Sequence, residues 1–403
     1  MITRTTYLDK ITPFINKPLI KVISGIRRSG KSTLLKLIRN KLIEEGNLEN
    51  QILYINFESF VFSDITNAKQ LYNWVLEQKH PSLRTYILLD EIQEILDWEK
   101  AVNSFMVDFD VDIYLTGSNS HLLSSELSTY LTGRYIEIPI YPLSYKEFIE
   151  FNEALHLSIP KEDTLNYYIR MGGFPIIHLM RNDQESAYKI IRDIYSSVIL
   201  RDTIQRFGIR DVELLERVIK YAFSNIGNTF SGKNVADYFK SQQRKLDINT
   251  VYNYLNALES AFILYRVPRY DIKGKELLKT QEKFYLSDVS LLYATMGYKD
   301  RLIGGVLENL IFLELKRRDY SVSIGKFDQT EIDFIGEKDG LKIYIQVAYQ
   351  LKEEQTIQRE FSNLSQIKDH YPKYVISMDS FWKDNIEGIK HVYLSDFLLA
   401  DYW

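Results

Sequence analysis

Eight residues near the start of the chain have the types and the order that bind a nucleotide phosphate. Gly25-Ile-Arg-Arg-Ser-Gly-Lys-Ser32 fits the pattern G-x-x-x-x-G-K-[ST]. We expect the loop backbone to wrap a phosphate, Lys31 to reach the outer phosphates and the Ser32 hydroxyl to bind Mg2+. A chance match in a glycine turn is the alternative. The predicted nucleotide-binding residues are Gly25, Ile26, Arg27, Arg28, Ser29, Gly30, Lys31, Ser32 and Thr33.

Two adjacent acids are candidates for the same site. Tyr86-Ile-Leu-Leu is an apolar run that predicts a buried strand ending in Asp90 and Glu91. The carboxyl end of such a strand in a parallel sheet lies beside the phosphate loop. We expect Asp90 to hold the hydration shell of Mg2+ and Glu91 to polarise the attacking water. Two exposed acids at a strand end are the alternative.

A polar strand end supplies another candidate. Residues 112–116 predict a strand that is followed by Gly117, Ser118 and Asn119. We assign Asn119 to sensing the γ-phosphate or the attacking water, with Ser118 as a near rival. A turn and helix N-cap before His121 would explain the same residues and does not exclude that role.

Arg134 is a candidate arginine finger. It precedes a predicted strand at 135–139. An arginine there could stabilise transferred phosphate charge within its own chain or in a neighbouring subunit. An exposed surface charge is the equally weighted alternative.

The elements that must position these residues occur in the required order. Residues 19–24 predict a buried strand before the loop, and 31–45 predict a helix that Gly46 ends. Further strands are expected at 51–57, 86–90, 112–116 and 135–139, with a helix at 68–79. This alternation predicts an α/β fold around a parallel sheet.

Taken in order, these motifs resemble one family, the prokaryotic ATP-binding proteins of the AAA superfamily whose phosphate loop has the sequence G-x-R-R-x-G-K-[ST]. The matching landmarks are Gly25–Ser32, Leu88–Gln93, Thr116–Ser118, Gly133-Arg134 and Tyr141–Phe148. The resemblance covers nearly the whole chain. It implies an AAA-type ATPase core with ATP and Mg2+ as ligands, and it says little about the biological role.

The resemblance also adds one nucleotide contact. Met171-Gly-Gly-Phe-Pro175 is similar to the glycine-x-proline element that lies near the adenine in related signalling ATPases. The resemblance therefore implies that Pro175 binds the nucleotide.

Composition limits the class of protein. A chain of 403 residues and 47.5 kDa has room for two to four domains. No apolar run approaches the roughly 20 residues of a membrane span, and the first residues lack the apolar region of a signal peptide. The absence of cysteine excludes disulfides and fits a reducing cytoplasm, which is the expected location. A net charge of -4 argues against a uniformly basic nucleic-acid-binding surface.

Four segments are expected along the chain. They are a P-loop ATPase core at 1–145, a helical lid at 146–211, a winged helix at 212–295 and an α/β restriction-endonuclease-like domain at 296–403. The lid would cap the nucleotide.

The third segment has the pattern of a DNA reader. Three predicted helices and a hairpin form a winged helix, and ten basic residues outnumber six acids between 233 and 283. Local positive charge favours contact with the DNA backbone. A solvated basic loop, or a winged helix that contacts only protein, is nearly as well supported. The candidate DNA contacts are Thr250, Tyr252, Asn253, Lys273 and Lys275.

The last segment resembles restriction-endonuclease-like domains. In those domains a helix Glu, a strand Asp and an E/Q-x-K pair gather one or two Mg2+ at a phosphodiester. Glu308, Asp333 and Gln346 match, but Ala348 takes the lysine position. We therefore expect an inactive or weak relic of the fold; an αβ domain with two acids by chance is the alternative.

Three functions follow from these features. The leading one is an Mg2+-dependent ATPase that couples its nucleotide state to a partner, with DNA as the first candidate. The others are an ATP-regulated nuclease, and a signalling or toxin-antitoxin-like switch with a protein partner. The sequence leaves open ATP against GTP, the partner and the oligomeric state.

Overall fold

The computed structural model describes residues 2–120, 133–157, 159–180, 183–241, 247–297, 299–380 and 385–403. The chain divides into two compact units. The first contains Met1–Pro142 with the short stretch Ser260–Phe262, and the second contains Leu143–Glu259 and Ile263–Trp403. Among the described residues, no helix is long and apolar enough to cross a membrane.

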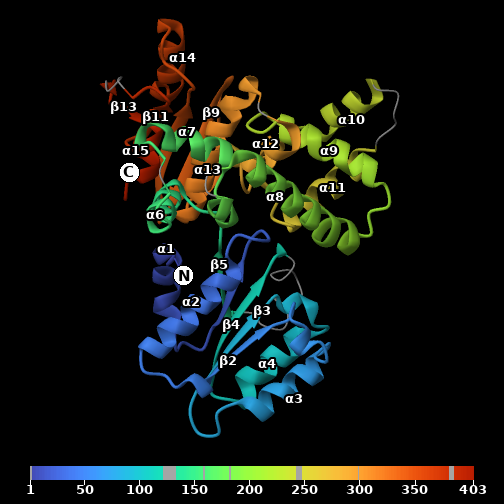
Figure 1. Cartoon of the computed structure of the whole chain (residues 1–403). Helices are drawn as coiled ribbons and strands as arrows, with labels where there is room; N and C mark the ends of the chain where they lie inside the picture. Colours follow the sequence, from blue (N-terminus) through green and yellow to red (C-terminus); the bar gives the residue numbers. More distant parts are fainter. Residues whose placement is uncertain are drawn as a thin grey trace. The chain divides into compact units, whose positions relative to one another are not determined.

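The first unit is built on a five-stranded parallel sheet with the order β2-β3-β4-β1-β5 (Figure 1). Its strands are β1 (Ile20–Ser24), β2 (Ile52–Asn56), β3 (Thr85–Asp90), β4 (Val111–Gly117) and β5 (Tyr135–Pro139). The prediction of an α/β fold with a parallel sheet is confirmed.

Helices cover both faces of this sheet. They are α1 (Thr5–Ile11), α2 (Lys31–Glu44), α3 (Ala68–Gln78) and α4 (Trp98–Asp108). Successive side chains of a strand point to opposite faces. Ile87 and Leu115 pack in one cluster with residues of α3 and α4, whereas Leu88 and Tyr114 pack in another with residues of α1 and α2. Such strands, apolar on both sides, produce the continuous apolar runs seen in the sequence.

The second unit begins with helices. Its described helices before the sheet are α6 (Tyr145–Ala154), α7 (Lys161–Met171), α8 (Gln184–Ser197), α9 (Val212–Ser224), α10 (Gly232–Ser241) and α11 (Ile248–Ser260). A π-helix at Val198–Gln205 continues α8. Helix α6 starts at a capping box, in which Ser144 and Glu147 each bond the other's backbone N–H.

An eight-stranded sheet with the order β12-β13-β11-β10-β9-β8-β6-β7 forms the rest of this unit. Its strands are β6 (Leu264–Asp271), β7 (Glu276–Leu286), β8 (Ser321–Phe327), β9 (Thr330–Lys338), β10 (Leu341–Val347), β11 (Lys373–Ser377), β12 (Asn385–Ile386) and β13 (Ile389–Tyr393). The helices are α12 (Ser290–Met296), α13 (Ile303–Arg317), α14 (Glu354–Ser365) and α15 (Leu394–Leu399).

The β6–β7 hairpin belongs to this sheet, although the sequence had placed its residues in a separate winged helix. Strand β6 pairs in parallel with β8, where Arg269 lies opposite Ile324. An isolated bridge also links Thr229, before α10, to Lys283 on β7. The expected boundary near residue 295 therefore falls between strands of one sheet. The four-segment division and the winged helix stay predictions.

Candidate functional site

The phosphate loop joins β1 to α2, as expected. Gly25 and Gly30 have φ angles of 146° and 104°, which side chains disfavour. A Cβ on Gly25 would lie only 2.2 Å from the backbone oxygen of Ile140. Glycine at position 25 is therefore required by the close approach of the segment that follows β5.

Lys31 lies in this loop at the start of α2. Its side chain is buried, and its Nζ donates to the backbone oxygens of Gly25, at 3.0 Å, and Ile26, at 3.3 Å. The same Nζ lies 3.5 Å from Glu91 Oε1. The structure thus brings the loop lysine and the acid after β3 together.

Asp90 is fully buried and accepts three side-chain hydrogen bonds. Ser32 Oγ and Thr116 Oγ1 donate to its Oδ1, at 3.0 and 2.6 Å, and the Tyr54 hydroxyl donates to its Oδ2 at 2.9 Å. Burial, followed by the nearby Asp90 carboxylate, raises the pKa of Tyr54. These donors fix the carboxylate beside the hydroxyl of the phosphate loop.

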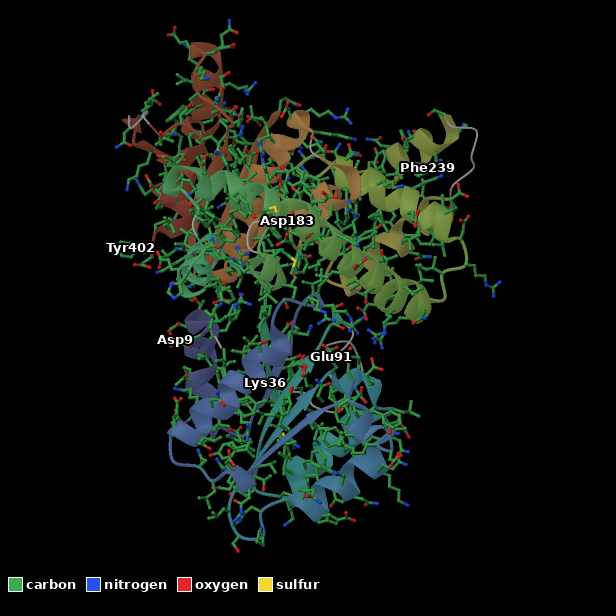
Figure 2. The ribbon with its side chains drawn as sticks, in the orientation of Figure 1. Asp9, Lys36, Glu91, Asp183, Phe239 and Tyr402 are labelled. Carbon is green, nitrogen blue, oxygen red and sulfur yellow. The ribbon has the colours of Figure 1, made fainter. Side chains whose placement is uncertain are left out.

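Glu91, labelled in Figure 2, follows β3 in a left-handed backbone conformation with φ 58°. Gln93 Nε2 and Ser118 Oγ donate to its Oε2, at 2.5 and 3.2 Å. Burial alone raises the pKa of Glu91, but Lys31 and these donors outweigh it and hold the pKa below its ordinary value. A positive φ is uncommon outside glycine and costs backbone energy. The backbone conformation that places this carboxylate beside Lys31 is therefore strained.

The other loop residues divide between buried and exposed positions. Arg27 is buried and its Nη1 donates to Glu58 Oε1 at 2.6 Å, whereas Arg28 is exposed with φ 68°. Ile26 is buried and Thr33 is exposed.

Ser29 Oγ is buried and has no hydrogen-bond partner in the described part of the chain. A buried hydroxyl without a partner inside a glycine-flanked loop fits a site that receives the oxygens of a phosphate. The Ser32 hydroxyl and Asp90 carboxylate likewise offer the oxygen ligands that Mg2+ prefers. The residues of this site therefore fit the phosphates of a nucleotide and Mg2+.

Ser118 and Asn119 are both buried at the carboxyl end of β4. The rival candidate, Ser118, contacts the predicted base Glu91, as described above. The sensing role of Asn119 stays a prediction. The helix expected from His121 lies outside the described residues.

Arg134 does not lie at the phosphate loop. Strand β5 runs parallel to β1 with Tyr135 opposite Ile20, so Arg134 precedes the amino end of the sheet, while the loop follows its carboxyl end. Its exposed side chain contacts Asn103, with Nη1 3.5 Å from Oδ1. The prediction that Arg134 acts within its own chain is wrong because the strand separates it from the loop; a role toward a neighbouring subunit stays a prediction.

Some residues of the site escaped sequence reasoning. Arg4 is buried, and its guanidinium donates to the backbone oxygens of Ser29, at 2.8 Å, and Tyr141, at 3.0 Å. Tyr54 was also missed as a contact of Asp90, and Gln93 was not assigned as a contact of Glu91, although it follows that residue by two positions within the landmark Leu88–Gln93. No local pattern marks Arg4 or Tyr54, because each acts through a contact that only the fold creates.

In the second unit, Pro175 opens a short 3-10 helix at Pro175–Met180. The preceding glycines are explained by packing inside that unit. A Cβ on Gly172 would lie 1.9 Å from Asp288 Oδ1, and one on Gly173 would lie 2.2 Å from the Leu143 backbone oxygen. The nucleotide contact of Pro175 stays a prediction.

Glu308, Asp333 and Gln346 are brought to one region of the second unit. Ile345 pairs with Phe334, so the next residues, Gln346 and Asp333, lie opposite each other on one face. Among the described residues, no group of three His, Cys, Asp or Glu side chains is placed to hold a metal ion. A buried lysine that the motif did not include lies among these acids instead.

The candidate DNA contacts are partly engaged in contacts within the protein. Tyr252 receives the Gly232 N–H at 3.4 Å, and Lys273 forms an ion pair with Asp328. Asn253 and Lys275 are exposed and Thr250 is half-buried. The excess of basic residues therefore overstates the positive charge left for a partner.

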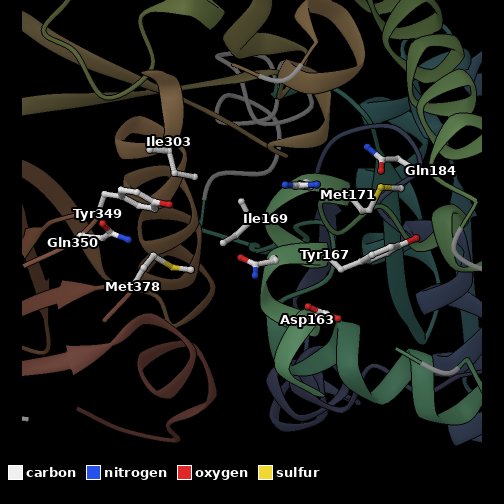
Figure 3. A pocket seen from close by; sticks show the side chains of 11 residues that line it. Asp163, Tyr167, Ile169, Met171, Gln184, Ile303, Tyr349, Gln350 and Met378 are labelled. Carbon is white, nitrogen blue, oxygen red and sulfur yellow. The ribbon is translucent and has the colours of Figure 1, made fainter. Parts of the chain in front are cut away.

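A cavity of about 670 Å³ also lies in the second unit (Figure 3). Tyr167 and Met171 line it from α7, and Tyr349 and Met378 line it after β10 and β11. None of the residues predicted to form a site lines this cavity.

Two protein families match parts of the chain. Residues 17–149 match the family described as an AAA domain. Residues 162–302 match a domain of unknown function.

Two proteins recorded as uncharacterized are similar over most of their length. One, from Haemophilus influenzae, is 39% identical over 99% of both chains. Another, from Methanocaldococcus jannaschii, is 31% identical over 83% of this chain and 75% of its own. A solved structure, the Walker-type ATPase of Pyrococcus abyssi, has a TM-score of 0.51 and 15% identity, covering 73% of this chain and 95% of that one. This last likeness shows the fold alone.

Proposed function

Because the chain belongs to one family with these uncharacterized proteins and carries an AAA domain at residues 17–149, we propose that it is an Mg2+-dependent ATPase. The proposal rests on one observation above all. Lys31 and Ser32 of the phosphate loop lie against Glu91 and Asp90, respectively, through the contacts described above. A lysine, a hydroxyl and two acids so arranged are the groups that phosphoryl transfer to water requires.

Each residue has a separate part in the proposed reaction. The loop N–H groups and Lys31 bind the phosphates, and Lys31 moves from the loop carbonyls to the outer phosphates when they are present. Mg2+, when bound, neutralises developing phosphate charge. Ser32 and Asp90 would hold it. Glu91, kept anionic by its surroundings, accepts a proton from the attacking water.

Nucleotide binding is tested by Lys31→Ala. We expect the variant to lose ATP binding and turnover by at least about a hundredfold, because the main cation of the loop is gone. Lys36→Ala is the matched control, since Lys36 is an exposed lysine on the same helix (Figure 2). Equal ATP affinity of the Lys31 variant and the wild type, measured by calorimetry, would refute the proposal.

We further propose that the nucleotide state controls engagement of DNA. The support is the succession of three helices and a hairpin, with exposed Asn253 and Lys275. Lys275→Ala should weaken DNA retention and reduce its salt dependence, because about one phosphate contact is lost. Lys299→Ala, at a half-buried lysine outside these helices and the hairpin, is the control.

A switch that contacts only protein gives a different result. ATP turnover would then be unchanged by double- or single-stranded DNA, and retention would not depend on Lys275. Stimulation of turnover by DNA, lost at high salt, is the result expected of the DNA-engaging ATPase.

A further inference from the structure

A buried lysine lies among three carboxylates in the second unit. Lys283, on β7, has a side chain that is only 3% exposed. Its Nζ lies 2.8 Å from Glu331 Oε1, 3.2 Å from Glu308 Oε2 and 3.7 Å from Asp333 Oδ1. The acids come from α13 and β9, so one ammonium joins the hairpin to a helix and to another strand.

Hydrogen bonds hold the acids in place. The Tyr285 hydroxyl donates to Glu308 Oε2 at 2.7 Å, and the Val347 N–H donates to Asp333 Oδ2 at 2.8 Å. Removing the ammonium would therefore leave carboxylates that are already fixed in place without their counter-charge.

The charges explain why Lys283 stays protonated. Burial lowers the pKa of Lys283, but the three carboxylates outweigh it, and the pKa lies above its ordinary value. Burial raises the pKa of Glu308, and burial together with Glu308 raises that of Asp333. Without the ammonium, these buried acids would need either protons or another cation.

The arrangement disagrees with a metal-dependent nuclease site. Glu308, Asp333 and Gln346 match that motif, and Gln346 Oε1 is buried without a partner in the described part of the chain. Yet the point where the carboxylates converge holds an ammonium, and no described group of acids is placed for a metal. Because Ala348 occupies the lysine position of the motif, the motif supplies no cation in addition to Lys283.

We propose that the Lys283 ammonium is the resident cation of this cluster, in the place that a divalent metal would take. The cluster fastens the β6–β7 hairpin to α13 and β9 and does not cleave phosphodiesters. This inference is separate from the proposed ATPase activity, because all of its residues lie in the second unit.

The experiment compares thermal unfolding of the nucleotide-free full chain in chelator and in rising Mn2+. Lys283→Met should lower Tm by roughly 5–10 °C because it leaves buried carboxylates uncompensated. Mn2+ should restore part of that loss, and Asp333→Asn in the same protein should abolish the restoration. Lys342→Met, on β10 beside Glu337, is the matched control and should leave Tm nearly unchanged.

Measurements on the wild-type protein can contradict the proposal. Since Mn2+ bound at the proposed Mg2+ site of the phosphate loop would also change Tm, the criterion is dependence on Asp333. The proposal predicts the same Mn2+ response in wild type and Asp333→Asn, and no DNA cleavage that depends on Asp333. A wild-type response or cleavage that disappears in Asp333→Asn would overturn it, as would a Lys283→Met protein as stable as Lys342→Met.

A charge-preserving variant keeps the test decisive if Lys283→Met does not fold. Lys283→Arg should fold and should show no Mn2+ response that depends on Asp333. Such a response in Lys283→Arg would also overturn the proposal.

Discussion

Arg4 shows how a residue outside every motif shapes the nucleotide site. Its guanidinium links the backbone of Ser29, inside the phosphate loop, to that of Tyr141, just after β5. It also lies 4.4 Å from the centre of the Tyr7 ring. The loop's conformation therefore depends on a cation supplied from before α1, in addition to its own glycines.

Replacing Arg4 tests this positioning role. Arg4→Gln leaves two buried carbonyls with poorer partners, at about 1–3 kcal/mol each, so Tm should fall by several degrees. ATP affinity should fall about tenfold while the hydrolysis rate of bound ATP changes less, because Arg4 acts on the loop and not on the water.

Arg39→Gln is the control for Arg4, since the exposed Arg39 pairs with Glu49 on the surface. A residue that served stability alone would lower Tm without changing ATP affinity at a temperature where both proteins are folded. That outcome would contradict the positioning role.

At the scale of elements, α13 carries two adjacent glycines in different surroundings. A Cβ on Gly304 would meet nothing within 4 Å, whereas one on Gly305 would lie 2.3 Å from the Ile226 backbone oxygen. The helix thus packs closely against the turn that follows α9 at one glycine and leaves the other open.

Alanine at these two positions should have opposite effects. Gly304→Ala should raise the free energy of unfolding by about 0.5–1 kcal/mol, because alanine favours helix. Gly305→Ala should lower it by about 1–3 kcal/mol, because the methyl group forces the backbones apart. Denaturant unfolding measures both. Two changes of the same sign would show that the packing of α13 differs from that described.

Burial of a histidine beside α6 predicts a pH dependence. His178 packs against the rings of Phe148 and Phe151, and burial lowers its pKa. The unfolded chain binds a proton near pH 6.5, but the folded chain does so only at lower pH. The unfolded state then binds more protons, so stability falls as pH drops below about 6.5.

His178→Phe should therefore lose less stability than wild type between about pH 7.5 and pH 5.5. The exposed His370 gives the control, and His370→Gln should keep the wild-type profile. Parallel profiles for wild type and His178→Phe in denaturant titrations would count against this account.

Across the whole molecule, the sequence predicted those parts of the site that consist of residues adjacent in the chain. The phosphate loop needs contiguous residues, and Asp90-Glu91 ends a strand whose apolar run is itself visible in the sequence. The contacts of Tyr54 and Thr116 with Asp90 could not be predicted, because they arise from the order of strands in the sheet. Likewise, Ala348 marked a missing lysine, but only the pairing of β6 with β8 places the hairpin in the later sheet, where Lys283 reaches the acids.

The position of Arg134 could have been predicted from the sequence. A parallel sheet with a strand at 135–139 was expected, and in such a sheet a residue before a strand lies at the end opposite the phosphate loop, as the pairing of β5 with β1 shows. The order of the strands, by contrast, is a property of the whole sheet that residue spacing does not specify.

The central claim is that Glu91 activates water for hydrolysis of ATP held by the phosphate loop. The most direct test is the single-turnover hydrolysis rate of Glu91→Gln with saturating ATP and Mg2+, with ATP affinity measured on the same protein. The account predicts nearly wild-type affinity and a hydrolysis rate at least about a hundredfold lower, because the amide cannot accept the proton. Hydrolysis at the wild-type rate would contradict it.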